Sequence, residues 1–159
     1  MKSLRLLRLE KEVEEELKEI AKLKRTATEV AGLADRIAKR VAKKFLPKLL
    51  LTTTKEALIE AIENNVTVAD KLYEYARLAK EKKLSRKQEK VWNTFKRIIK
   101  LLRKFSNYVK PFVNEYFTAD FVIEAVRETR PELAEILETE KGKKWLEESI
   151  YELRDILGW

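Results

Sequence analysis

The sequence predicts an all-α fold, with a long N-terminal helix followed by a bundle of about five to six shorter helices. Apolar residues recur at alternating steps of three and four over long stretches, which is the spacing of one helix face. The chain of 159 residues contains only three Gly and three Pro, too few for the frequent turns of a many-stranded sheet. No segment shows the strict apolar and polar alternation of a half-buried strand. These observations favour helices throughout.

Residues 1–48 are expected to form one long amphipathic helix that is basic in its second half. Their apolar or small residues form a seam that is typical of a coiled coil or a long bundle helix. The seam is broken only at Glu16, where Leu17 stands beside it, and consists of Leu6, Leu9, Val13, Ile20, Leu23, Ala27, Val30, Ala34, Ile37 and Val41. We expect Pro47 to end this helix, because proline lacks an amide hydrogen and clashes with the preceding turn.

The expected length of this helix predicts self-association. A helix of about 43 residues would be roughly 65 Å long, whereas a compact domain of this size has a radius of gyration of about 15 Å. The helix is therefore expected to protrude, to bend near Gly32, or to pair with another copy. Its middle is rich in small residues such as Ala31, Ala34 and Ala38, which would let a partner helix approach closely. We expect a homo-oligomer formed through this seam.

Residues 49–159 are expected to form the helical bundle, and hydroxyl residues mark the start of its first helices. A Thr or Ser followed three residues later by an acidic residue or Gln can form a capping box. The expected pairs are Thr53 with Glu56, Thr67 with Asp70, and Ser85 with Gln88.

The helix that begins at Ser85 is expected to carry a second apolar seam. This seam stays in phase across Pro111, so we expect a kink there rather than a break. Its residues are Val91, Phe95, Ile98, Leu102, Phe105, Val109, Phe112 and Tyr116.

Three more helices are expected in the C-terminal part. Thr118 begins the first, and Thr129 caps the second, with Pro131 in its first turn. The last helix contains Trp145, which we expect to be buried, and stops at Gly158.

The net charge of +8 is concentrated in two stretches. Residues 22–48 hold nine basic groups against two acidic ones, and residues 80–110 hold twelve against two, whereas residues 111–159 hold six against twelve. Lys and Arg on a rigid helix can neutralise successive phosphates and release counterions. The basic residues expected to contact nucleic acid are Arg36, Lys39, Arg40, Lys43, Lys90, Lys96, Arg97, Lys100, Arg103 and Lys104.

The composition speaks against an enzyme. The chain has no Cys and no His, which removes thiolate chemistry and the commonest general base and zinc ligand. No phosphate-binding loop, dinucleotide turn or nucleophile motif is present. Carboxylate pairs at helical spacing, such as Asp120 with Glu124, are expected to face solvent or to pair with Lys. We therefore expect no catalytic residue, no metal and no cofactor.

Composition also indicates a source and a compartment. Lys, Glu, Arg, Leu and Ile dominate, while Gln and Met each occur once, a pattern typical of hyperthermophiles. We expect a hyperthermophilic archaeon or one of its viruses or plasmids. No signal peptide and no membrane-spanning run is visible, so the expected location is the cytoplasm, or a virion.

One stretch resembles a known DNA-binding motif. Leu78-Ala79 together with residues 84–92 is similar to the helix-turn-helix of homeodomains over about fifteen residues. The resemblance implies a helix that reads bases in the major groove. The sequence departs from the family where it has Glu89 and Asn93 in place of core apolar residues, and Phe95 in place of the base-reading Asn. These departures put base reading in doubt.

Three functions are consistent with these features. The first is a nucleic-acid-binding accessory protein that contacts DNA without sequence specificity. The second is a structural virion or filament subunit, since the basic, helical, cysteine-free character is similar to coat proteins of archaeal filamentous viruses. The third is an adaptor or inhibitor that docks on an acidic host protein.

Overall fold

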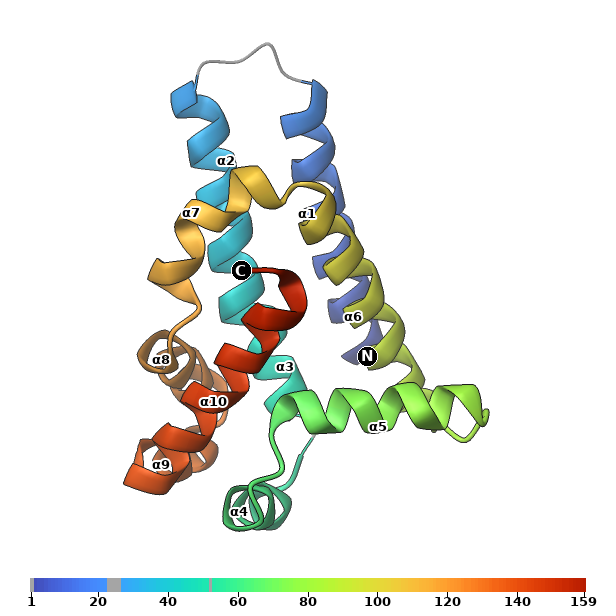
Figure 1. The fold of residues 1–159 in the computed structure, drawn as a ribbon, viewed down its shortest axis with the longest axis vertical. Helices are drawn as coiled ribbons and strands as arrows, with labels where there is room; N and C mark the ends of the chain where they lie inside the picture. The colour runs from blue at the N-terminus through green and yellow to red at the C-terminus, as the bar shows by residue number, and fades with distance from the viewer. Residues whose placement is uncertain (1, 23–26, 52) are drawn as a thin grey trace.

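The fold is helical throughout the residues described by the computed structural model, which are 2–22, 27–51 and 53–159 (Figure 1). The predicted all-α class is confirmed, and these residues contain no strand. Their helical elements are more numerous than predicted. They are α1 (Lys2–Lys22), α2 (Ala27–Arg40), the π-helical turn η1 (Val41–Phe45), α3 (Leu46–Leu51), α4 (Lys55–Glu63), α5 (Val68–Lys80), α6 (Arg86–Lys104), α7 (Ser106–Tyr116), α8 (Ala119–Thr129), α9 (Pro131–Glu138) and α10 (Glu140–Leu157).

The prediction of one long N-terminal helix is wrong. Helices α1 and α2 lie side by side as two arms of a hairpin (Figure 1), and Arg40 of α2 contacts Glu12 and Glu16 of α1. A seam with alternating three- and four-residue spacing suits a hairpin as well as a straight helix, because each arm needs an apolar face toward the other. Leu23 of the predicted seam lies outside the described residues, as do the side chains of Leu6 and Ala27.

Pro47 does not end the helical stretch. It is the second residue of α3, which follows α2 and η1 directly and continues to Leu51. The amide of Leu46 donates to the carbonyl oxygen of Val41, five residues earlier, which is the π-helical pattern. A proline removes one α-helical hydrogen bond and crowds the preceding turn. The wider π turn directly before Pro47 accommodates both effects.

The second predicted seam is divided at Phe105 rather than kinked at Pro111. Helix α6 ends at Lys104, Phe105 has φ −112° and ψ 24°, and α7 begins at Ser106 with Pro111 inside it. The turn lets the two halves of the seam meet different partners, because α6 packs on α1 while α7 packs on α2.

Most of the predicted helix ends are confirmed. The capping boxes of Thr67 with Asp70 and Ser85 with Gln88 are both formed, and the Thr118 hydroxyl accepts from the Phe121 amide. Two predicted caps are wrong by one residue. Thr54, not Thr53, caps α4, and Arg130, not Thr129, precedes α9.

The apolar core is one cluster that includes Leu9 of α1 and Leu157 of α10, so residues on both sides of position 48 contribute to it. Ala34, Ala38 and Ala42 are completely buried within the chain. These three residues of the small-residue seam are therefore already packed against the chain itself, whereas Ala31 is exposed. The structure gives no support to self-association through this seam.

Helix α10 joins the C-terminal helices to α5. The buried Trp145 indole, 1% exposed as the sequence predicts, donates to the carbonyl oxygen of Val66 at 2.8 Å. The Ser149 hydroxyl accepts from the Val68 amide at 3.2 Å. Helix α5 is thus held at its N-terminal end by side chains of α10. No helix in the described ranges has both the length and the apolar character needed to cross a bilayer.

Candidate nucleic-acid interface

The cations predicted on the N-terminal hairpin differ in their surroundings. Arg36 and Lys39 are exposed on α2. Lys43 lies in η1 with its ammonium 3.7 Å from the Glu128 carboxylate of α8. Arg40 is largely covered, and its guanidinium binds Glu16. Of these residues, Arg36 and Lys39 are thus the most available to a ligand.

Helix α6 carries the densest group of exposed cations. Burial of Val91, Ile98 and Leu102 fixes its inner face, and the cations lie on the remaining surface of the helix. The exposed residues are Lys90, Lys96, Arg97, Lys100, Arg103 and Lys104.

Several cations of α6 have partners inside the chain. The Lys96 ammonium lies over the Trp92 ring at 5.7 Å from its centroid. Arg103 donates to the backbone carbonyl oxygen of Ile156. Neither contact involves a carboxylate, so the charge of both side chains remains available to an anion.

Arg97 differs from its neighbours because it is bound to carboxylates of α1. Its Nε lies 2.5 Å from Glu10, and another of its nitrogens lies 3.5 Å from Glu14. Burial raises the pKa of the Glu10 carboxyl, and the nearby Arg97 charge partly opposes this effect. Arg97 and Arg40 therefore both compensate carboxylates of α1, and their predicted role in binding phosphate is not favoured.

Helix α1 carries exposed cations that the sequence-based prediction missed. Arg8, Lys11, Lys18 and Lys22 are exposed, as is Glu15. The prediction missed Arg8, Lys11 and Lys18 because the six acidic groups of residues 1–21 outnumber the five basic ones, while Lys22 was counted with the basic stretch that follows. The spacing of three and four between these five residues was the available signal, since it places all of them on one helix face.

The resemblance to a homeodomain does not extend to a base-reading surface. Phe95, at the position of the family's base-reading Asn, is buried and stacks between Phe45 and Trp92, with both centroid distances at 5.9 Å. The inner face of α6 at this point belongs to the core, so Phe95 cannot reach a groove.

Two further aromatic residues, Trp159 and Tyr73, differ in their surroundings. Trp159 packs edge-to-face on Phe117 at 5.3 Å and donates to the Ser106 hydroxyl at 2.9 Å. Tyr73 is 64% exposed on α5. Trp159 is thus engaged within the chain, whereas Tyr73 faces outward.

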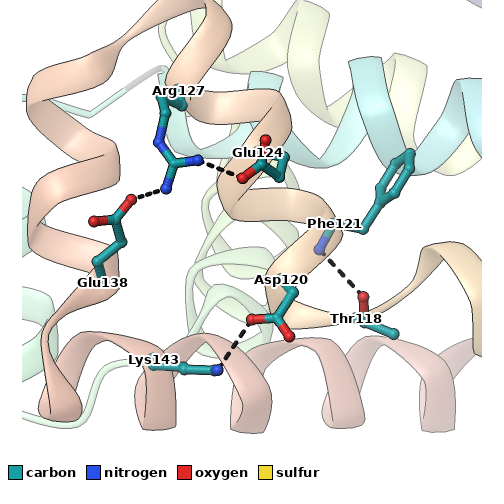
Figure 2. Close-up of polar contacts among 7 residues, drawn as sticks. All are labelled: Thr118, Asp120, Phe121, Glu124, Arg127, Glu138 and Lys143. Atoms are coloured by element: carbon teal, nitrogen blue, oxygen red, sulfur yellow. Dashed lines mark hydrogen bonds and ion pairs between the residues drawn. The ribbon is translucent and has the colours of Figure 1, made fainter.

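A small charged pocket lies among α8, α9 and α10 (Figure 2). It has a volume of about 240 Å³. Arg127 binds both Glu124 and Glu138, and Lys143 lies 3.0 Å from Asp120, which raises the pKa of the Lys143 ammonium. The charges of the pocket are thus paired with one another. No cluster of carboxylates suited to a metal ion occurs in the part of the chain that the structure describes.

Comparison with protein-family models, with curated proteins and with solved structures finds no match to this chain. We therefore infer function from the geometry and charge of the helices.

Proposed function

We propose that this protein binds nucleic acid, in the first place DNA, through non-specific contacts from exposed cations on α2 and α6 to phosphates. The observation that supports the proposal best is the outer surface of α6. Lys90 and Lys100 are exposed there and form no ion pair with any described residue. A rigid helix with uncompensated lysines is suited to a row of phosphates.

The type of cation favours binding without sequence specificity. Lysine carries a compact charge on a flexible stem, whereas the planar guanidinium of arginine donates two hydrogen bonds in a fixed geometry. Two arginines of the predicted set, Arg40 and Arg97, are bound to Glu residues of α1. The cations that remain are mainly lysines, whose point charges suit contacts to backbone phosphates.

The proposal is tested by removing uncompensated cations from α6. The double variant Lys90→Gln and Lys100→Gln should bind a fluorescein-labelled duplex about tenfold more weakly than the wild type at physiological salt, because two phosphate contacts are lost. The matched control is Lys141→Gln with Lys144→Gln, which removes the same charge from exposed positions of α10. Equal affinities of the two variants would overturn the proposal.

A protein partner is the second candidate, and exposed tyrosines favour it. Tyr73 of α5 and Tyr151 of α10 are 64% and 75% exposed, and α5 and α10 pack on each other. Tyrosine is enriched at protein interfaces. A pull-down that recovers one acidic protein after nuclease treatment, and loses it on Tyr73→Ala with Tyr151→Ala, would favour an adaptor or inhibitor.

A further inference from the structure

We infer that α1 supplies the central row of a three-helix basic face that fits a nucleic-acid duplex rather than a single strand. The inference rests on the proposed function and specifies its ligand. It adds Arg8, Lys11, Lys18 and Lys22 to the interface and defines the arrangement of the rows.

Ion pairs fix the place of α1 between α2 and α6. Glu12 and Glu16 bind Arg40 of α2, while Glu10 and Glu14 bind Arg97 of α6. At about 100° per residue, the two carboxylate pairs lie roughly 160° apart around the axis of α1. Helices α2 and α6 therefore flank α1 on nearly opposite sides.

The outward side of α1 lies between the side that faces α2 and the side that faces α6. Leu9, Val13 and Leu17 face the core, so the line opposite to them faces solvent. It consists of Arg8, Lys11, Glu15, Lys18 and Lys22. The line spans about 21 Å at 1.5 Å per residue. Four cations against one carboxylate make it a basic row.

Glu10, Glu12, Glu14 and Glu16 of α1 thus bind cations of the flanking helices, although Glu14 also lies 3.4 Å from the Lys18 ammonium and Glu15 is exposed. Glu10 is 6% exposed, and the side chain of Glu16 is 17% exposed. Both are largely covered by the helices beside them. Although α1 holds six basic residues and six acidic ones, the row that it presents to solvent is basic, and it joins the exposed cations of α2 and α6.

The spacing of the rows suits two phosphate backbones. Packed helices lie about 8–10 Å apart, which falls between the widths of about 6 Å and 12 Å of the minor and major grooves of B-DNA. Neighbouring rows can therefore contact the two strands that border one groove. A single strand offers one backbone and would engage fewer cations.

Exposed aromatic rings lie elsewhere on the molecule. Proteins that bind single strands stack bases on such rings. Among the described residues, the exposed tyrosines are Tyr73, Tyr108 and Tyr151, on α5, α7 and α10. On α6, Trp92 is half-buried and stacks on Phe95. The three-helix face offers charge rather than stacking surfaces, which again favours a duplex.

The test compares a duplex of about 20 base pairs with a single strand of the same length, each titrated with the full chain over a range of salt concentrations. The variant is Lys11→Gln with Lys18→Gln, and the control is Lys141→Gln with Lys144→Gln. In Figure 1 α1 and the start of α10 lie at opposite ends of the molecule. Circular dichroism and thermal unfolding check that both variants fold like the wild type.

We expect the wild type to bind the duplex at least about tenfold more tightly than the single strand. The α1 variant should reduce the slope of log affinity against log salt by about 1.8, because each lost phosphate contact removes about 0.9. The control should leave the slope unchanged. Equal or tighter binding of the single strand, or an unchanged slope for the α1 variant, would overturn the inference and leave the proposed function standing. No salt-dependent binding of either probe would overturn both.

Discussion

Arg40 of α2 donates a 2.7 Å hydrogen bond to Glu16 of α1, 24 residues earlier in the chain. In a straight helix these residues would lie about 36 Å apart. The contact therefore requires the N-terminal region to fold back on itself. Through this contact an acidic group of α1 and a basic group of α2 bind each other and connect the two helices.

The Arg40 and Glu16 pair should be energetically coupled. Both side chains are largely covered, at 28% and 17% exposed, and the second carboxylate oxygen of Glu16 is buried without a partner. Arg40→Ala should lower the free energy of unfolding by about 1–3 kcal/mol, because it leaves a buried carboxylate uncompensated. Chemical denaturation of the two single variants and the double variant measures the coupling.

Arg36→Ala is the control for this cycle, because Arg36 is exposed on the same helix and its loss should change stability by less than about 0.5 kcal/mol. Additive effects of Arg40→Ala and Glu16→Ala would contradict the hairpin contact.

Gly142→Ala should destabilise the junction of α9 and α10. A Cβ at this position would lie 2.1 Å from the carbonyl oxygen of Ile136 and 2.9 Å from the Cα of Leu137, so backbone atoms would have to move. We expect a loss of about 1–3 kcal/mol, as for other overpacked sites, measured by thermal or chemical unfolding.

Gly32→Ala is the matched control and should raise the free energy of unfolding rather than lower it. Gly32 lies inside α2, and no described atom packed against the helix there lies within 4 Å of the position that a Cβ would occupy. Alanine favours the helix by up to about 1 kcal/mol. A Gly142→Ala variant as stable as the wild type would show that α9 and α10 do not approach as described.

Tyr116 should make stability depend on pH at the alkaline end. Its hydroxyl donates a 2.5 Å hydrogen bond to Asp35, and this bond, with burial, raises the pKa of the phenol from 10.0 to about 12. In the unfolded chain the phenol loses its proton near pH 10. The contribution of Tyr116 to stability is therefore complete below pH 10 and is lost as the pH rises through about 12.

Tyr116→Phe should lower the free energy of unfolding by about 1–3 kcal/mol at neutral pH. It should also make the loss of stability between pH 10 and 12 smaller than in the wild type. Tyr73→Phe, at an exposed position, should do neither. Absorbance of tyrosinate gives a second readout, since the wild type should show an ionisation at about pH 12 that Tyr116→Phe removes. Its absence would contradict the contact with Asp35.

Arg97→Gln should destabilise the protein more at pH 7 than at pH 4. Burial raises the pKa of Glu10, so the folded state favours the protonated carboxyl, and stability falls as the pH rises above the ordinary value of 4.5. Without Arg97 the ionised form of Glu10 would be less compensated, so this fall should become larger. Urea unfolding at pH 7 and pH 4 measures the loss of stability caused by Arg97→Gln. The control is Lys100→Gln, about one turn away on the same helix. A loss that is the same at both values would contradict the role given to Glu10.

The sequence predicted local features to within one residue, as the helix caps show. Thr67 with Asp70 and Ser85 with Gln88 form the capping boxes that their spacing predicts, because each box involves only one helical turn. The antiparallel packing of α2 on α1 and the turn at Phe105 were not predicted. An apolar seam keeps the same spacing whether the helix continues or reverses, and only the packing of α1 on α6 and α7 on α2 decides between the two.

The candidate site was predicted only in part for a similar reason. Charge counts identified α6 correctly as a basic helix, whereas α2 itself holds three basic residues against two acidic ones. These counts could not show that Arg40 and Arg97 are bound to α1, since those partners lie 24 to 87 residues away in the chain. Over residues 1–21 the same counts gave a small acidic excess, although four of the carboxylates bind cations of the neighbouring helices while Lys11 and Lys18 are exposed.

The central claim is that exposed cations of this helical protein bind nucleic-acid phosphates, and the salt dependence of duplex affinity tests it most directly. Fluorescence anisotropy with a duplex of about 20 base pairs should give a linear fall of log affinity with log salt, with a slope of about −4 or steeper, which corresponds to four or more phosphates. A slope near zero, or no binding at about 50 mM salt, would contradict the claim.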